Sequence, residues 1–390
     1  MSKWNARPIW IVPVVLALAI LACSPGATEP TATPLPRPTQ IPFPTATTRA
    51  PRPTARPVAT KPVAHATATT PPDQPTADNS TGNSTAGAPF ELDTTPYVHK
   101  TGAFTVTLPA GWTKDEKDHS VYVTSPDKVA NIEILFDNVG VQFDAATINT
   151  YITAEEKNFF GAFDSYTANN FEPQNDGSIL VYKTLKLSDG TPRTVFSYYW
   201  QDGTVMYEQD FWVDTAQYDA YVKPLLAVAN SMITDPTAGA NATPYGITYL
   251  YTDPTKLFQF NVPYGWTQVT TTGNHSSVVT FTSPDSLSYV ENITYDDGTT
   301  VSKSDAGAFA RTLLSQYYKL TDLKITDDKV QPDGSELLVW NSAAGGVDGE
   351  SFFETRGTTF LLLTWVVNSS DYDLFQPMWS TLVKSYAIPK

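Results

Sequence analysis

The stretch that decides the fold is Phe104-Thr-Val-Thr-Leu-Pro-Ala-Gly-Trp112, and its spacing recurs in Phe258-Gln-Phe-Asn-Val-Pro-Tyr-Gly-Trp266, 154 residues later. In the first copy Phe, Val and Leu alternate with Thr, which predicts a strand with one apolar face. The proline cannot donate to a sheet ladder and so ends the strand, and the glycine permits a turn. The tryptophan then covers apolar residues beneath it. A repeat this long predicts two copies of one domain, each with a buried tryptophan as its lid.

The N-terminus has the pattern of a lipoprotein signal peptide. Lys3 and Arg7 precede an apolar run over residues 9–22, which is short for a membrane span. The run ends at Ile20-Leu-Ala-Cys23, which resembles a bacterial lipobox. We therefore predict that residues 1–22 are removed and that Cys23, the only cysteine in the chain, is the lipid attachment residue. The expected location is a cell membrane, with the lipid-anchored protein facing outside the cytoplasm.

Residues 23–95 consist mostly of Thr, Pro, Ala and Ser, a composition that predicts a disordered stalk. Basic residues are scattered through its first part, and we interpret them as charges of a solvated linker. The whole chain carries a net charge of −15, so the parts that follow the stalk are acidic. Acidic domains disfavour nucleic acid as a partner, because its phosphates are also negative.

Two folded copies are predicted over residues 96–235 and 248–390, with a linker at 236–247. The linker is poor in apolar residues, so we expect the copies to share little core and to fold independently. In each copy three strands precede a helix, three longer strands follow, and a second helix closes the domain. Asp144 is the predicted N-cap of the first helix in copy one, and Ser304 is its counterpart in copy two.

The closing helices contain Pro224 and Pro377 at nearly the same place, and each proline should either open its helix or kink it. The strands at 195–200 and 360–367 are apolar at almost every position, which indicates that both sheet faces are covered. The predicted fold class is therefore α+β, with an antiparallel sheet sandwiched by helices in each copy.

Three features resemble the PsbP-like family, which includes photosystem II extrinsic proteins and bacterial lipoproteins such as the LpqN group. They are the Phe-x-Val-x-Leu-Pro-x-Gly-Trp stretch, the next hairpin with Ser125-Pro-Asp127, and a closing helix that ends near Ser231 or Ser385. The resemblance covers nearly all of both copies and implies a binding or assembly role. It transfers no functional residues, and the tandem copies and long stalk argue against a photosystem role.

Candidate catalytic residues are few. Of the four histidines, His65 lies in the stalk and His99 precedes the first strand, while His119 and His275 each precede a Ser in the same hairpin of the two copies. No cysteine or second histidine stands near them at ligand spacing, so we interpret His119 and His275 as polar turn residues.

Two short motifs resemble those of penicillin-binding enzymes, namely Ser125-Pro-Asp-Lys128 and Lys100-Thr-Gly102. Their order is reversed, and copy two has Ser286 in place of the lysine, so we interpret them as coincidences. The acidic pairs Asp296-Asp297 and Asp327-Asp328 lack the alternating spacing of a calcium loop and are interpreted as solvated turns. The sequence predicts no metal site and no cofactor.

One hairpin of copy one is rich in aromatic residues, which we assign mostly to the core, although some could form an edge platform for a sugar or peptide. The leading functional hypothesis is a non-catalytic, lipid-anchored binding or complex-assembly lipoprotein whose partner is an unknown envelope protein. The alternatives are a cell-wall or carbohydrate-binding module for a wall polymer, and an envelope hydrolase. No ligand-binding residue is assigned. The aromatic residues are Tyr198, Tyr199, Trp200, Tyr207, Phe211 and Trp212.

Overall fold

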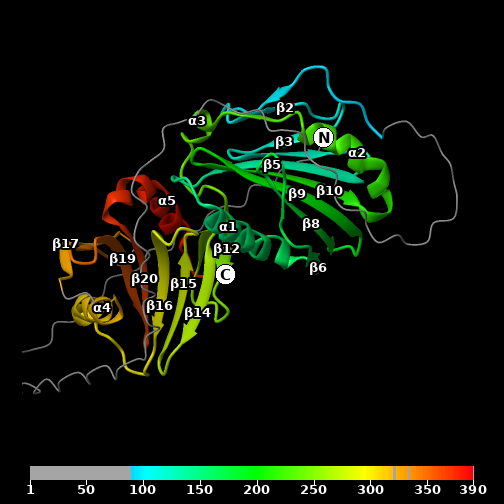
Figure 1. Cartoon of the computed structure of the whole chain (residues 1–390). Coiled ribbons are helices and arrows are strands. Elements are labelled where there is room, and N and C mark those ends of the chain that lie inside the picture. Colours follow the sequence, from blue (N-terminus) through cyan, green and yellow to red (C-terminus); the bar gives the residue numbers. More distant parts are fainter. Residues whose placement is uncertain (1–88, 319–321, 333, 390) are drawn as a thin grey trace, which may run out of the picture. The chain divides into compact units, whose positions relative to one another are not determined.

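A computed structural model describes residues 89–318, 322–332 and 334–389 (Figure 1). The predicted signal peptide, Cys23, His65 and most of the stalk lie outside these residues. The described residues all belong to one compact unit, Pro42–Lys390. Within them, no helix is both long enough and apolar enough to cross a membrane.

Copy one contains an eight-stranded antiparallel sheet and a three-stranded one. Its strands are β1 (Tyr97–Val98), β2 (Phe104–Val106), β3 (Thr113–Glu116), β4 (Ser120–Thr124), β5 (Ala130–Asn138), β6 (Asp164–Ala168), β7 (Glu172–Pro173), β8 (Ile179–Lys186), β9 (Pro192–Asp202), β10 (Val205–Asp214) and β11 (Ile233–Thr234). The large sheet has the order β3-β4-β5-β10-β9-β8-β6, with β7 also paired to β8, and the small one has the order β1-β2-β11. The helices are α1 (Ala145–Asn158) and α2 (Tyr218–Ala229), with 3-10 turns η1 (Phe160–Ala162) and η2 (Thr215–Gln217).

Copy two repeats this succession of strands in a seven-stranded sheet, β14-β15-β16-β20-β19-β18-β17, beside the pair β12-β13. Its strands are β12 (Thr248–Thr252), β13 (Gln259–Pro263), β14 (Thr267–Thr272), β15 (Ser276–Thr282), β16 (Ser288–Tyr295), β17 (Lys324–Val330), β18 (Glu336–Ser342), β19 (Val347–Arg356) and β20 (Thr359–Asn368). Its helices are α4 (Lys303–Tyr318) and α5 (Tyr372–Ser385), with the 3-10 turn η3 (Ser369–Asp371) between β20 and α5. The predicted α+β class with antiparallel sheets is confirmed.

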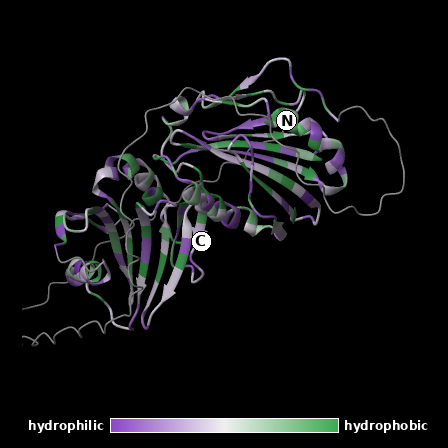
Figure 2. Cartoon of the chain, viewed as in Figure 1, coloured by the Kyte–Doolittle hydropathy of each residue, from purple (hydrophilic) through white to green (hydrophobic). Residues whose placement is uncertain are grey.

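Successive side chains along the strands of copy one's large sheet point to opposite faces, and each face packs against a different helix. Figure 2 shows hydrophobic and hydrophilic residues alternating along the strands. One face packs in a cluster with α2, where Ile134 of β5 and Phe211 of β10 join Leu225 of the helix. On the other face, α1 packs against β8, β9 and β10 through Tyr199 and the charged groups described below. Both faces are covered, as the apolar strand at 195–200 indicated.

The two tryptophan lids lie in the core as predicted. Trp112 is 6 % exposed and Trp266 is 0 % exposed. Trp112 meets Phe90 edge-on at 5.0 Å between ring centres, and Trp266 meets Tyr245 in the same manner at 5.4 Å. The repeated stretch is therefore a packing element in both copies.

Helix ends agree with the predictions in copy one and differ in copy two. Asp144 accepts a hydrogen bond from the backbone N–H of Thr147 at 2.8 Å, as an N-cap should. In copy two α4 begins at Lys303, so Ser304 lies within the first turn, and the prediction of Ser304 as the cap is wrong. Pro224 and Pro377 both lie inside their helices, so neither opens one.

A serine at the end of each closing helix fastens that helix to the repeated stretch. The Ser231 hydroxyl accepts the backbone N–H of Thr107 at 2.9 Å, and the Ser385 hydroxyl accepts that of Asn261 at 2.7 Å. Each hydroxyl in turn donates to a carbonyl in the last turn of its own helix, three residues earlier. The same two-way link therefore joins helix and strand in both copies.

We expect Ser231→Ala and Ser385→Ala each to lower the free energy of unfolding by about 1 kcal/mol, because each leaves a strand N–H without its acceptor. Urea titration followed by fluorescence measures the change. Thr150→Ala is the matched control, since its exposed hydroxyl bonds to a helix carbonyl and links no second element. Equal stability of the serine variants and wild type would contradict the role assigned to the link.

The expectation that the copies share little core is wrong. Tyr245 follows the short helix α3 (Pro236–Gly239), is 1 % exposed, and donates its backbone N–H to Asn138 of β5 at 2.8 Å. One buried apolar cluster combines Tyr151 and Ile152 of α1 with Tyr245 and Trp266. The linker at 236–247 has few apolar residues, and its composition therefore suggested little burial. The large ring of Tyr245 is nevertheless buried between the copies.

Candidate functional site

His99 has a structural environment. Its ring is 1 % exposed, is stacked on Phe104, and lies within hydrogen-bond distance of the Thr101 hydroxyl (2.8 Å) and the Lys117 carbonyl (3.1 Å). Burial lowers the pKa of His99, because the charged imidazolium is poorly solvated there. Its ring joins β2 to the loop after β3.

His119 and His275 occupy corresponding loops but have different surroundings. His119 is half-buried, stacks on Phe136 at 5.4 Å, and lies so close to Gly246 that a Cβ there would meet its ring at 2.3 Å. Burial lowers the pKa of His119. His275 is exposed and has a φ of 137°. The interpretation as a polar turn residue therefore fits His275, whereas His119 is a packing residue.

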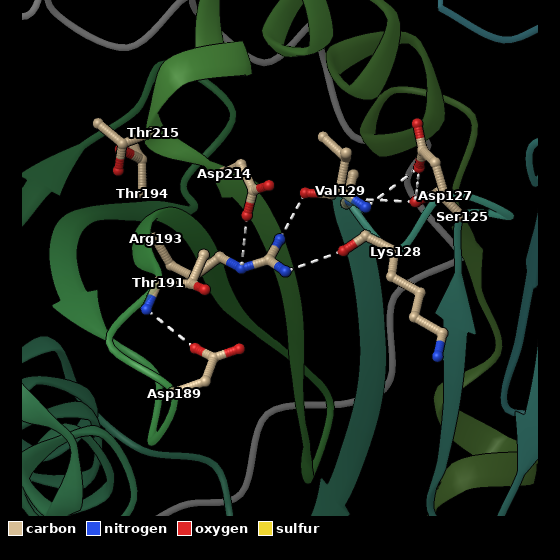
Figure 3. Close-up of polar contacts among 11 residues, drawn as sticks. Ser125, Asp127, Lys128, Val129, Asp189, Thr191, Arg193, Thr194, Asp214 and Thr215 are labelled. Carbon is tan, nitrogen blue, oxygen red and sulfur yellow. Dashed lines mark hydrogen bonds and ion pairs between the residues drawn. The ribbon is translucent and has the colours of Figure 1, made fainter.

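The Ser125 hydroxyl is committed to the turn between β4 and β5. It donates to the Asp127 carboxylate at 2.6 Å and accepts the backbone N–H of Ala130 at 3.0 Å. Figure 3 shows the amine of Lys128 directed away from this hydroxyl, and Lys128 is exposed with a φ of 62°. Ser283 in copy two makes the same bonds, which supports the interpretation that the Ser-x-x-Lys match is a coincidence.

Arg193 of β9 fastens this turn to the sheet (Figure 3). Its guanidinium donates to the carbonyls of Lys128, at 2.9 Å, and Val129, while its Nε lies 3.1 Å from the Asp214 carboxylate. The sequence analysis did not single out Arg193. The planar guanidinium spans two carbonyls and a carboxylate at once, which explains a buried arginine in a strand.

The acidic pairs are used locally, and the interpretation of Asp327 and Asp328 as a turn is wrong, because both lie in strand β17. Asp296 accepts hydroxyl hydrogen bonds from Thr358 and Thr359, and Asp328 forms an ion pair with Arg311 at 3.2 Å. Across the part of the chain that the structure describes, no group of three or more His, Cys, Asp and Glu side chains could hold a metal ion. Lys100 pairs with Asp118 at 2.7 Å on the surface.

The aromatic hairpin of copy one does not form a surface platform. All six of its aromatic side chains are buried, because helices and loops cover both faces of β9 and β10. The suggestion that some of them stack on a sugar or peptide is therefore wrong. The residues are Tyr198, Tyr199, Trp200, Tyr207, Phe211 and Trp212.

Charged side chains lie buried between α1 and the sheet of copy one, at a place that the sequence analysis missed. We call them the buried charge cluster: Glu155 and Glu156 of α1, Lys183 of β8, and Glu208 and Asp210 of β10. Each is 4 % exposed or less. Four carboxyl groups thus surround one amine in an environment where unpaired charge is costly.

Lys183 is at the centre of the cluster. Its amine donates to Glu156, lies 4.0 Å from Asp210, and stands 3.3 Å from the centre of the Phe160 ring. The Tyr199 hydroxyl also donates to Glu156 at 2.8 Å, and the Ser197 hydroxyl donates to Asp210. Glu156 and Asp210 are therefore supplied with donors.

The remaining carboxyls favour their protonated forms. Burial raises the pKa of Glu155 to about 8, and it raises that of Glu208 well above the usual value. On the same face Glu133 of β5 has its pKa raised to about 8 by burial, and Asp137 has its pKa raised to about 7. The arrangement binds protons at neutral pH.

Copy two carries uncharged residues at the corresponding sheet positions. By register, Lys183, Glu208 and Asp210 correspond to Trp340, Leu362 and Thr364. The Trp340 indole donates to Ser351 at 2.9 Å, and Ser351 lies 3.0 Å from the Thr364 hydroxyl. Its ring fills the space above Gly349, where a Cβ would meet it at 2.3 Å.

A signal for the cluster was present in the sequence. Glu208 and Asp210 lie two residues apart in a strand that is apolar on either side of them, at 205–207 and 211–213, and Lys183 follows four apolar residues in another strand. Charged side chains two residues apart in a strand point to the same face of the sheet. When that face is covered, these side chains must either form ion pairs or, for carboxylates, bind protons. Glu155 and Glu156 follow Ile152 by three and four residues, so they lie on the same face of the helix as Ile152.

Two solved structures are similar to this chain. The solution structure of cyanobacterial PsbP (CyanoP) from Synechocystis sp. PCC 6803 matches 40 % of this chain and 98 % of its own, with a TM-score of 0.30 and 16 % identity. A crystal structure from Bacteroides thetaiotaomicron VPI-5482 matches 68 % of this chain and 87 % of its own, with a TM-score of 0.25 and 12 % identity. Both scores are low, so the α+β assignment rests on the elements of this chain. A scan of family models and a search of curated proteins found no match.

Proposed function

We propose that this chain is a lipid-anchored, non-catalytic protein that binds or assembles a complex outside the cytoplasm. The observation that carries the proposal is the order of its parts: a lipobox-like Ile20-Leu-Ala-Cys23, a Thr/Pro-rich stalk, and two acidic folded copies. A stalk of this composition holds folded domains away from a membrane surface that is itself anionic.

The non-catalytic part of the proposal is supported by how the candidate residues are used. Ser125 holds a turn, Lys128 is directed away from it, and His99 bonds to Thr101 and a backbone carbonyl. A nucleophile must be free to approach a substrate and have a base within reach. These residues are occupied by bonds that maintain the fold.

Lipidation is tested at Cys23. We expect Cys23→Ser to abolish labelling with a radioactive fatty acid and to leave the precursor uncleaved, because the thiol is the acceptor of the lipid. Gel mobility and autoradiography of membrane fractions report both outcomes. Ser24→Ala is the matched control and should be labelled like wild type. Undiminished labelling of Cys23→Ser would place the anchor elsewhere.

The binding role is tested by crosslinking intact envelopes that contain the full-length protein, followed by affinity purification. We expect an envelope protein to be recovered with wild type and with Ser24→Ala. Recovery should fall with Cys23→Ser, because the unanchored protein is no longer concentrated at the membrane. Retention on purified wall polymer without any protein partner would favour the wall-binding alternative. Turnover of an ester, peptide or glycoside substrate by the purified protein would refute the proposal.

A further inference from the structure

Glu155 and Glu208 differ from the other members of the buried charge cluster. Both oxygens of Glu208 and one oxygen of Glu155 are buried without a donor from any other residue that the structure describes. The two carboxyls face one another across the contact between α1 and β10, within hydrogen-bond reach. Two carboxylates cannot bond to each other, because neither has a donor, but a carboxyl that takes up a proton can donate it to the other.

Among the described residues, Lys183 of β8 is the basic group near Glu208, and its amine is already bonded to Glu156. The other titratable groups that face the pair are acidic or phenolic. They are Tyr151 and Glu156 of α1, Asp137 of β5, Tyr199 of β9, Asp210 of β10, and Tyr264 after β13.

Copy two shows what a carboxyl at this depth needs when it has no acidic neighbour to share a proton. Glu291 of β16, which corresponds to Glu133 by register, accepts hydroxyl hydrogen bonds from Thr280, Tyr317 and Tyr318. No hydroxyl among the described residues donates to either oxygen of Glu208 or to Oε2 of Glu155. The position of Glu208 is taken by Leu362 in copy two, so the pair is a property of copy one.

We propose that protonation of Glu155 and Glu208 fastens α1 to the sheet of copy one, and that ionisation of this pair loosens the helix. Each ionisation leaves a buried negative charge, and Lys183 cannot serve both Glu156 and Glu208. Separation of α1 from β10 hydrates both carboxylates. The movement would also break the bonds from the Asn158 amide to the carbonyls of Tyr264 and Trp266, at 2.7 and 3.0 Å.

The direction of the pH dependence follows from the raised pKa values of the two carboxyls. The folded protein keeps a proton that the unfolded chain gives up at its ordinary carboxyl pKa, so the contribution to stability is complete at acidic pH. That contribution is lost as pH rises from 4.5 through about 8, the ordinary and folded pKa of Glu155. Copy one should therefore be less stable in mildly alkaline medium than at acidic pH.

The test is hydrogen exchange of the full-length protein at pH 6 and pH 9, corrected for the intrinsic dependence of exchange on pH. Protection of α1 should fall about a hundredfold, since the folded pKa of about 8 lies about two units above pH 6 and the loss is nearly complete at pH 9. The double variant Glu155→Gln/Glu208→Gln should lose this dependence, because amides supply donors and do not titrate. Glu133→Gln is the matched control, a buried carboxyl on the same face outside the pair, and it should keep the wild-type fall.

Infrared difference spectra of the wild-type protein keep the proposal testable if the double variant fails to fold. A protonated-carboxyl band should be present at pH 6 and lose intensity by pH 9 in step with the loss of α1 protection. An unchanged protection of α1 across this range would overturn the proposal. So would a double variant that keeps the wild-type fall, or the absence of a titrating band in the wild-type spectra.

Discussion

Trp266→Ala is expected to lower the free energy of unfolding by about 3–5 kcal/mol, the usual cost of removing a buried tryptophan. The side chain is 0 % exposed, and its indole N–H has no acceptor among the residues that the structure describes, so its contribution comes from packing. A domain of this size has about 5–15 kcal/mol in total, so the change is a large fraction of the margin. Because the apolar cluster around Trp266 includes Tyr151 and Ile152, copy one should lose protection as well.

Trp112→Ala is the matched comparison, since the apolar cluster around Trp112 lies within copy one and its flanking segments. Hydrogen exchange measured peptide by peptide during urea unfolding separates the two copies. Trp112→Ala should expose copy one first, whereas Trp266→Ala should expose β13 and α1 together. If Trp266→Ala left the protection of both copies unchanged, the tryptophan would not be the packing element described here.

Lys183→Met is the second change with a large expected effect, about 3–5 kcal/mol lost from the stability of copy one. The amine is the cation bonded to Glu156, and its removal leaves that carboxylate buried without a cation, bonded to the Tyr166 and Tyr199 hydroxyls. Methionine keeps most of the volume, so the loss reports charge rather than a cavity. Urea unfolding at neutral pH, followed by circular dichroism, measures it.

The double variant Lys183→Met/Glu156→Gln is the control for this experiment, because it removes both charges of the pair. It should be more stable than Lys183→Met alone, since no uncompensated carboxylate remains at position 156. A double variant as unstable as the sum of the single changes would show that Lys183 and Glu156 act independently, which would contradict the ion pair in the structure.

The fold could be predicted largely because its signals are local. The repeated stretch ends at a buried tryptophan in each copy, Asp144 caps α1, and the glycines of the Asp-Gly turns at 190 and 203 have the positive φ that such turns require. Strands β3 and β14 were missed because they are polar edge strands with no apolar face to reveal them: β3 is Thr-Lys-Asp-Glu, and β14 is mostly Thr. Their positions are set by pairing with β4 and β15.

The candidate site could not be predicted in the same manner, because it depends on contacts between distant segments. The apolar spacing of Ile148 and Ile152 predicted which face of the helix is buried, but no prediction was made for Glu155. Its burial depends on Lys183 and Glu208, which meet it only after β8 and β10 have joined the sheet. Likewise, the shared core depends on Tyr245, whose burial no periodicity in its own segment indicates.

The contrast between Lys183, Glu208 and Asp210 in one copy and Trp340, Leu362 and Thr364 in the other has an evolutionary consequence. If both copies descend from one duplicated domain, the charged and uncharged sets cannot be exchanged by independent single substitutions. Each one-step intermediate buries a charge without a partner or leaves a cavity where an indole had been, at a cost of several kcal/mol. Recombination between the two halves of the gene would create the same unstable mixtures. Selection should therefore keep the halves diverged even where their folds remain alike.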